Sequence, residues 1–182
     1  MDRIIKSMEN KYLQPSIDMV RRTFTNSESA EDAQIVVNII NELRSMRTYV
    51  PELDLVMVDE NDEVIGYAMF SKIHLQGKFE DELLWLNPVA VKTELQRQHI
   101  SKEIIEYGFE KAKEMGFSVV IVEGNPQNYQ NRGFKTSVNF GIVAGESVDI
   151  PAPECLMVKE LVKDSHKRIN GVLEYTEYKS LR

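Results

Sequence analysis

Cysteine is nearly absent from this sequence, and Cys155 is the only one. A single thiol cannot build a disulfide framework, a zinc knuckle or a CxxC redox pair within one chain, so we expect a reduced protein without a metal site. Apolar stretches are short, since none approaches the ~20 residues that a membrane span needs. The first residues also lack the apolar segment of a signal peptide. We therefore expect a cytoplasmic protein that does not act at a membrane.

Basic residues are also fewer than acidic ones. Lys and Arg number 22 against 29 Asp and Glu, and the net charge is −7 at pH 7. Contact with nucleic-acid phosphates needs a basic surface, so we expect no nucleic-acid partner. Linkers, repeats and low-complexity segments are missing from the 182 residues as well. A chain of this length fits one domain with one core, and we predict a single domain over residues 1–182.

Hydrophobic periodicity predicts the elements of the first half. Apolar residues recur at helical spacing over 15–24 and again over 35–43. The period then changes to that of a strand over 53–58, and a charged turn leads to its hairpin partner over 64–70. The first third of the chain is thus expected to be helical, and a β-hairpin follows it.

The second half alternates strands with one long helix. Residues 83–91 are predicted to be a strand with an irregularity at Pro88, because proline cannot donate to a β-ladder. A helix over 101–115 follows, closed by Gly116 as a C′ glycine. The later elements are a buried strand over 119–122, a short helix over 126–132, strands that include 155–158, and a tight turn at Asn170-Gly171. Together these elements predict a mixed α/β fold.

The junction after residues 89–91 is the clearest candidate for a ligand site. A polar loop over 92–99 leads from this strand to the helix that starts near Ser101. The first amides of a helix lack partners and carry partial positive charge, so they favour an anion. The loop region is neutral to slightly positive on an acidic chain, which suits one pyrophosphate; its charges are Lys92, Arg97 and Lys102 against Glu94 and Glu103.

A plain helix is the structural alternative at this junction. Thr93-Glu94-Leu95-Gln96 has the form of a capping box. On that interpretation the helix begins at Thr93, runs without interruption to Met115 and binds no ligand.

Several segments follow one another in a characteristic order. They are Leu86-Asn87-Pro88-Val89-Ala90-Val91, Gln96-Arg97-Gln98-His99-Ile100-Ser101, Gly124 to Phe134, Pro151 to Leu161 and Gly171 to Tyr175. In this order and spacing the chain resembles the GNAT superfamily of acyl-CoA-dependent N-acetyltransferases, and most closely its YhbS-like branch. The resemblance implies the GNAT fold, a mixed central sheet of about six or seven strands that is flanked by helices and splayed between its two central parallel strands.

The resemblance also implies a reaction and its residues. A primary amine, of a small molecule or of a protein, would attack the thioester of acetyl-CoA directly. Val89, Ala90 and Val91 would hold the pantetheine arm and the acetyl carbonyl, Asn125 would reach the cofactor from the next strand, and Tyr129 would protonate the departing thiolate. The residues implied to hold the pyrophosphate are Gln96, Arg97, Gln98, His99, Ile100 and Ser101.

These assignments have alternatives. The family usually has glycines where this sequence has His99 and Ser101, and only glycine reaches positive φ freely. The alternative function is therefore a catalytically silent GNAT-fold domain that acts as a ligand sensor or a protein-binding module. Tyr129 can instead be a packing residue, and Asn125 a turn residue and helix N-cap only. An unrelated α/β domain is the third interpretation.

The general base and the acceptor are not identified by any motif. An alkylammonium has a pKa near 10, so a base must remove its proton at neutral pH. Glu123 is the nearest candidate, and the alternative for it is a solvated strand end. Residues 80–82 are typical of a charged loop. His74 and His166 have no partner residues at a recognisable spacing. The resemblance places the amino-terminal helices and the loop 72–81 around the acceptor. The sequence leaves the acceptor and the oligomeric state open, a homodimer included.

Overall fold

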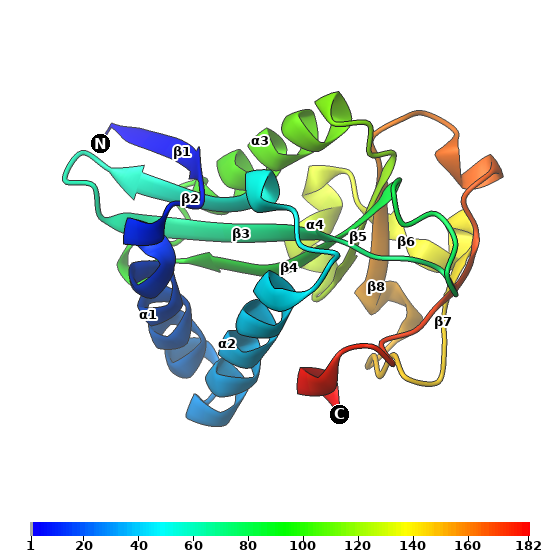
Figure 1. Ribbon diagram of the computed structural model, residues 1–182, viewed down its shortest axis with the longest axis horizontal. Helices are drawn as coiled ribbons and strands as arrows, with labels where there is room; N and C mark the ends of the chain where they lie inside the picture. The colour runs from blue at the N-terminus through cyan, green and yellow to red at the C-terminus, as the bar shows by residue number, and fades with distance from the viewer. Residues whose placement is uncertain (1) are drawn as a thin grey trace.

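The computed structural model describes residues 2–182. Over this range seven strands form one sheet in the order β1-β2-β3-β4-β5-β8-β6, and β4 and β5 are its only parallel neighbours (Figure 1). This arrangement confirms the predicted mixed α/β class. The strands of this sheet are β1 (Arg3–Ser7), β2 (Asp54–Asp59), β3 (Val64–Lys72), β4 (Leu83–Val91), β5 (Val119–Glu123), β6 (Lys135–Thr136) and β8 (Leu156–Glu160).

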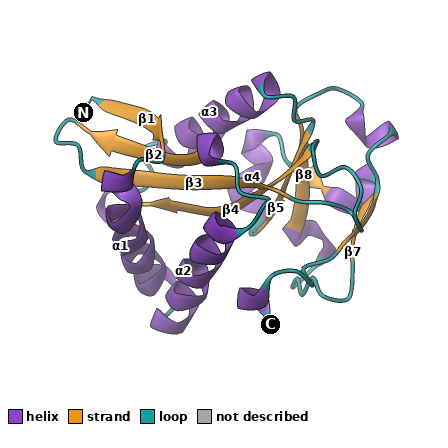
Figure 2. Ribbon diagram, viewed as in Figure 1, coloured by secondary structure: helices purple, strands orange, loops and turns teal. Residues whose placement is uncertain are grey.

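Helices cover both faces of the sheet (Figure 2). Two helices near the amino terminus, which form a V, pack on one face, and the long central helix packs on the other (Figure 1). Short 3₁₀ turns occur at Pro51–Leu53, Thr93–Leu95, Gln130–Arg132, Ser137–Phe140, Pro153–Cys155, Ser165–Lys167 and Lys179–Leu181. The α-helices are α1 (Asn10–Ser27), α2 (Ala30–Ser45), α3 (Ile100–Glu114) and α4 (Pro126–Tyr129).

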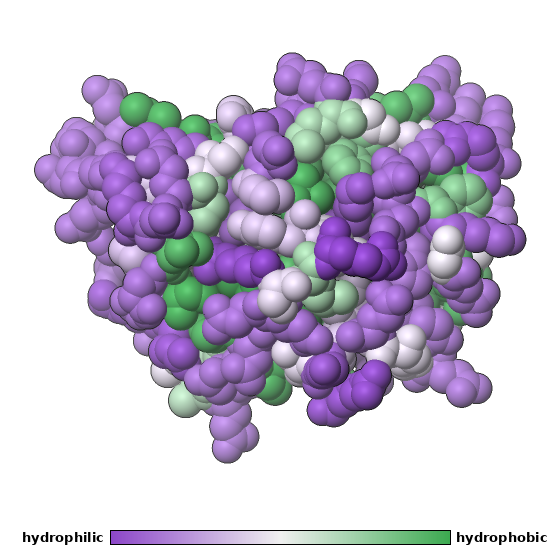
Figure 3. All heavy atoms as spheres, viewed as in Figure 1, coloured by the Kyte–Doolittle hydropathy of each residue, from purple (hydrophilic) through white to green (hydrophobic). Residues whose placement is uncertain are grey.

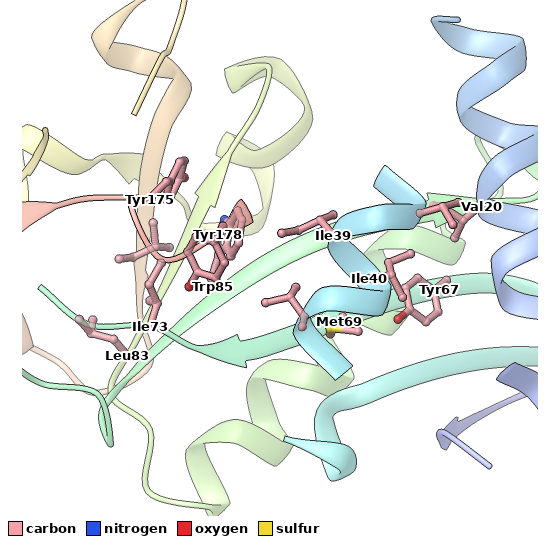
Figure 4. Close-up of a cluster of buried hydrophobic side chains, with 14 of the residues drawn as sticks. Val20, Ile39, Ile40, Tyr67, Met69, Ile73, Leu83, Trp85, Tyr175 and Tyr178 are labelled. Carbon is pink, nitrogen blue, oxygen red and sulfur yellow. The ribbon is translucent and has the colours of Figure 1, made fainter. Parts of the chain in front are cut away.

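Side chains of β2 alternate between two cores. Val56 and Val58 belong to the core under α1 and α2, whereas Leu55 and Met57 belong to the core under α3. Successive strand residues point to opposite faces, so a sheet covered on both sides requires continuous apolar runs. Figure 4 shows the first of these cores, in which side chains of α2 such as Ile39 point toward the sheet.

The ends of α2 and α3 have well-defined caps. Ser29 Oγ accepts a hydrogen bond from Asp32 N at 3.0 Å at the start of α2. At the end of α3, Gly116 N and Phe117 N each donate at 3.0 Å to carbonyls of the last turn, and Gly116 has φ of +95°. This pair of bonds is a Schellman motif, and it confirms the predicted C′ glycine.

The irregularity predicted at Pro88 is present, although β4 runs unbroken from Leu83 to Val91. Its pairing with β3 shifts register, with Ala68 opposite Val89 and Phe70 opposite Leu86. Two residues of β4 therefore face one residue of β3, which is the arrangement of a β-bulge.

Three expectations are wrong. The amino terminus is not wholly helical, because Arg3–Ser7 forms an edge strand along β2. The continuous helix over 93–115 does not form, because Arg97 and His99 have positive φ and α3 begins at Ile100. Asn170-Gly171 does not turn a hairpin; Gly171 instead begins β9 (Gly171–Leu173), which pairs in parallel with β7 (Ile142–Ala144).

Charged and polar side chains cover most of the face seen in Figure 3, and smaller apolar areas lie between them. Within residues 2–182, no helix combines the length and the apolar content of a membrane span.

Candidate functional site

A cleft opens where β4 and β5 stop pairing. The two strands pair from Leu83 opposite Val119 to Trp85 opposite Ile121, while β4 continues to Val91. This divergence is the predicted splay between the parallel strands. The cleft has a volume of about 800 Å³, within the range of roughly 300–1,000 Å³ that is usual for small-molecule sites. Residues of α1, β4, α3 and α4 line it.

The main chain of β4 alternates between β3 and the cleft. Lys92 N donates at 3.0 Å to a β3 carbonyl, so Lys92 and Ala90 direct their main-chain groups toward β3. Val89 and Val91 alternate with them, and their amides and carbonyls consequently point away from β3. The Val91 carbonyl accepts a hydrogen bond of 3.2 Å from a threonine hydroxyl of α1, not from a strand. The cleft is therefore lined by main chain of β4 that has no strand partner.

The loop after β4 contains two residues in the left-handed region. Arg97 and His99 have φ of +63° and +64°. Histidine is one of the non-glycine residues that adopt this conformation more often than most. His99 precedes α3, and its carbonyl accepts from Glu103 N at 3.0 Å. The backbone at His99 thus has the conformation that a glycine provides most easily, and the free amides at the start of α3 border the cleft.

Most charges of this loop are paired, but Arg97 is not. Four ion pairs are Lys92–Glu63, Arg22–Glu94, Arg3–Glu103 and Lys102–Glu106. Arg97 lines the cleft and has no acidic partner among residues 2–182. Its charge is therefore available to an anion.

Arg132 brings a second cation to the start of α3. Its Nη2 donates to Ser101 Oγ at 2.7 Å, and its Nη1 donates to the Asn128 carbonyl. Its Nε is buried and has no hydrogen-bond partner within residues 2–182. A cation beside a helix N-terminus interacts unfavourably with the helix macrodipole. The placement of Arg132 therefore does not stabilise α3, but it does suit the binding of an anion.

Asn125 and Tyr129 follow the end of β5. Asn125 is the N-cap of α4, with its Oδ1 accepting from Gln127 N at 3.0 Å. The Tyr129 ring packs edge-on against Phe134, with ring centroids 5.6 Å apart. Burial raises the pKa of the Tyr129 hydroxyl, although the Arg132 charge opposes this. Asn125 thus caps a helix and Tyr129 packs against an aromatic ring, as the structural alternatives predicted. Both residues also line the cleft.

A second cavity, of about 260 Å³, adjoins the cleft, and Val36, Asn87 and Glu123 line both spaces. Glu123 Oε2 accepts a hydrogen bond of 3.1 Å from the Tyr175 hydroxyl. Glu123 is exposed at the end of β5, as the alternative of a solvated strand end predicted. Partial desolvation nevertheless raises the pKa of its carboxyl group; the Tyr175 hydrogen bond opposes this shift, and the charge of Asp149 adds to it. The carboxylate is therefore a somewhat stronger base than an isolated glutamate.

The sequence pattern of the acetyltransferase (GNAT) family matches residues 17–140, more than half of the chain. The chain belongs to the GNAT family. It is also 27% identical over 168 residues to the uncharacterized N-acetyltransferase YhbS of Escherichia coli (strain K12), a match that covers 90% of this chain and 91% of the relative. The predicted likeness to the YhbS-like branch of GNAT proteins is confirmed.

Solved GNAT structures have the same fold. The crystal structure of E. coli YhbS in complex with CoA matches with a TM-score of 0.81 at 23% identity, over 95% of this chain and 89% of that one. A GNAT acetyltransferase from Brucella melitensis in complex with acetyl-CoA matches with a TM-score of 0.71 at 18% identity, over 100% of this chain and 99% of that one. The predicted GNAT fold is therefore confirmed over nearly the whole chain.

Nearly all residues that were predicted as cofactor-binding or catalytic lie together in the cleft. Val89, Ala90, Val91, Gln96, Arg97, His99, Ile100, Ser101, Asn125 and Tyr129 all line it. Gln98 is not among the lining residues, and its carbonyl accepts from an Arg3 guanidinium at 3.0 Å. Ala90 pairs with Tyr67 of β3, so it can offer the cleft its methyl group but not its amide. The roles of these residues stay predictions.

The other candidate bases have partners elsewhere on the molecule. Arg47–Glu80, Lys72–Asp81 and Arg168–Glu82 are ion pairs, and the two histidine rings each contact a carboxylate, in His74–Glu177 at 3.0 Å and His166–Glu160 at 2.6 Å. None of these acidic or histidine candidates lines the cleft or the second cavity, whereas Glu123 lines both. The charged-loop interpretation of residues 80–82 fits these pairs.

Sequence reasoning anticipated part of the walls of the second cavity. Helix α2 lines it through Ile35, Val36 and Ile39, whereas the loop 72–81 lines neither the cavity nor the cleft. The residues that sequence reasoning missed are Asp149, Tyr175 and Leu181. These positions are far apart in sequence and share no motif. The one available signal was Tyr175, which ends the last of the resembling segments.

Proposed function

We propose that the protein transfers an acetyl group from acetyl-CoA to a primary amine by direct attack. The amine nitrogen bonds to the acetyl carbon, the bond from that carbon to sulfur breaks, and the amine loses one proton while the departing thiolate gains one. The observation that carries this proposal is the divergence of β4 from β5, with the main chain of Val89 and Val91 turned into the cleft. Membership of the GNAT family supports it.

The loop end of the cleft fits the diphosphate of the cofactor. Arg97 and Arg132 are the cations there, and the α3 N-terminus adds free amides and partial positive charge. The left-handed backbone at His99 gives the loop a glycine-like course despite the imidazole. We infer that these groups bind the diphosphate and that β4 main chain binds the pantetheine arm.

The main-chain amides of β4 would act on the acetyl carbonyl. Bound acetyl-CoA supplies an activated acyl carbon with a thiolate leaving group. As the amine attacks, negative charge develops on the carbonyl oxygen, and a fixed N–H that points at this oxygen stabilises it. Val89 and Val91 are the candidates because their amides are not used by β3.

Proton transfer would involve Tyr129 and Glu123. A tyrosine with a raised pKa stays protonated at neutral pH, so its hydroxyl can donate to the thiolate. Only roughly one alkylamine in a thousand is neutral at pH 7. Glu123, whose pKa is raised by partial desolvation and by the charge of Asp149, is suited to take the proton of the attacking ammonium.

Two measurements test the proposal. Calorimetric titration should give a micromolar Kd for acetyl-CoA, and a screen of amines should detect acetyl-CoA-dependent thiol release. Tyr129→Phe should lower turnover about 100-fold or more while leaving the Kd unchanged. Absence of heat at millimolar acetyl-CoA would instead support the silent domain, and unaltered turnover of Tyr129→Phe would remove Tyr129 from the mechanism.

A further inference from the structure

We infer that the second cavity is the acceptor site and that it selects a small primary amine with an uncharged, apolar body. This inference rests on the proposed acetyl transfer. It goes beyond it by naming the chemical class of the acceptor, which neither the family nor the relatives specify.

The cavity leads to the reacting end of the cleft. Asn87 of β4 and Glu123 of β5 line both spaces, and they lie on the two strands that diverge. An amine held in this cavity therefore has its nitrogen next to the carboxylate that we propose as the base. Its body extends away from the cleft, toward α2 and the carboxy-terminal segment.

The walls of the cavity combine an aliphatic and aromatic part with a polar part that consists of Asn87, Glu123, Ser147 and Asp149. Ile39 of α2 faces Trp85, and the Trp85 ring stacks on Tyr175 with centroids 5.1 Å apart (Figure 4). Ile35 and Leu181 also line the cavity, although they are 46% and 41% exposed. These two side chains therefore form an apolar rim, against which an apolar distal end buries surface and a charged distal end does not.

The charged side chains that line the cavity are both acidic, and the charge of one acts on the other. Glu123 and Asp149 line it, and no lysine or arginine of residues 2–182 does so. Carboxylates attract an ammonium group and repel a carboxylate. The carboxylates therefore favour an amine and disfavour an amino acid, and the choice between a monoamine and a diamine depends on the apolar rim.

The carboxy-terminal segment is held in place over the cavity. The Glu42 carboxylate of α2 accepts hydrogen bonds from Lys179 N at 2.7 Å and Ser180 N at 2.8 Å. These bonds position Leu181 at the rim. The volume of about 260 Å³ lies below the roughly 300–1,000 Å³ of drug-sized sites, so the cavity suits a small molecule and not several residues of a peptide.

Three acceptors with the same six-carbon chain test the inference. Hexylamine, 1,6-diaminohexane and 6-aminohexanoate carry the same reacting amine and differ at the far end, which is apolar, cationic or anionic. We expect kcat/KM for hexylamine to exceed that for each of the other two by about tenfold or more. Asp149→Asn should raise KM for hexylamine about two- to fivefold, the range for an exposed charge pair, without changing the Kd for acetyl-CoA.

A change of specificity gives a sharper test. Ile35→Glu places an anion at the apolar rim and should lower the preference for hexylamine over 1,6-diaminohexane by about two- to fivefold. Ile4→Glu is the matched control, because Ile4 is an exposed isoleucine of β1 that lines neither space. It should leave the preference unchanged.

The outcomes separate the two proposals. If acetyl-CoA gives no heat, or if no amine releases thiol, the proposed transfer fails and the acceptor assignment fails with it. If acetyl-CoA binds and thiol is released, but hexylamine is no better than the diamine or the amino acid, only the acceptor assignment is overturned. An unchanged preference in Ile35→Glu overturns it as well.

Discussion

Arg132 Nη2 donates a hydrogen bond of 2.7 Å to Ser101 Oγ, and this contact joins the segment after β5 to the first turn of α3. The guanidinium is thereby fixed at a helix end that already carries partial positive charge. Such a cation destabilises the helix by about 0.3–1 kcal/mol, roughly the amount that one hydrogen bond offsets. Because the two effects nearly cancel, the contact adds little to stability, and we interpret it as part of the proposed anion site.

Arg132→Gln should therefore separate binding from stability. We expect the Kd for acetyl-CoA to rise about 10- to 100-fold, since hydrogen bonds to charged groups contribute about 1.5–3 kcal/mol. The free energy of unfolding should change by less than about 1 kcal/mol. Calorimetry and urea denaturation measure the two quantities. Ser101→Ala is the control, with a smaller effect on Kd; an unchanged Kd in Arg132→Gln would show that the arginine is structural.

His99 gives a second prediction about the same loop. A left-handed conformation costs a non-glycine residue about 1–2 kcal/mol, and it is a strong outlier for a β-branched residue. We expect His99→Gly to bind acetyl-CoA at least as tightly as the wild type, and His99→Val to bind about tenfold more weakly. Gln98→Val is the matched control, because Gln98 is adjacent and does not have positive φ. Weaker binding by His99→Gly would mean that the imidazole itself holds the cofactor.

The fold was largely predictable because its signals are local. Period-2 and helical patterns, the proline of β4 and the glycine after α3 each identify an element without knowledge of its neighbours. The strand Arg3–Ser7 was not predictable, since it is short, lies at the sheet edge and buries little. The capping box at Thr93 indicated a helix that the left-handed residues Arg97 and His99 prevent, and a sequence pattern does not reveal positive φ at non-glycine residues.

One part of the candidate site was predictable from the sequence and the other part was not. Its cofactor end lies on two continuous segments, so motifs could nominate most of its residues. The second cavity is assembled from Ile35, Trp85, Glu123, Asp149 and Tyr175, which five separate parts of the chain supply. Their common function depends on tertiary packing, and no local pattern carries it.

The pH dependence of turnover should report on Glu123. A base is active when deprotonated, and the pKa of Glu123 is raised above 4.5 by partial desolvation and by the charge of Asp149. The ratio of wild-type to Glu123→Gln kcat/KM cancels the ionisation of the amine. We expect this ratio to fall as pH decreases through the raised pKa. Asp149→Asn should move the fall to lower pH, because the Asp149 charge contributes to the shift; a ratio independent of pH would exclude Glu123 as the base.

Away from the cleft, the buried ion pair between Asp54 and Arg44 should contribute strongly to the free energy of unfolding. Asp54 is fully buried and accepts from Arg44 Nε at 3.0 Å, Tyr49 at 2.6 Å and Tyr67 at 2.7 Å. Asp54→Ala leaves the arginine uncompensated, and we expect a loss of about 3–5 kcal/mol in the free energy of unfolding. Tyr49→Phe removes one hydrogen bond to the charge and should cost about 1.5 kcal/mol. Equal losses in urea denaturation would contradict this network.

Close packing between α3 and β3 leads to the last prediction. A Cβ added to Gly108 of α3 would overlap the ring of Phe70, so glycine allows the helix to lie directly on the strand that pairs with β4. Gly108→Ala should gain about 1 kcal/mol in helix propensity and lose more to overpacking, for a net destabilisation of about 1–2 kcal/mol. In a Phe70→Leu background the overlap is relieved, and the same substitution should become neutral or stabilising. A double-mutant cycle in urea measures this coupling; additive effects would mean that the ring does not limit the approach of the helix.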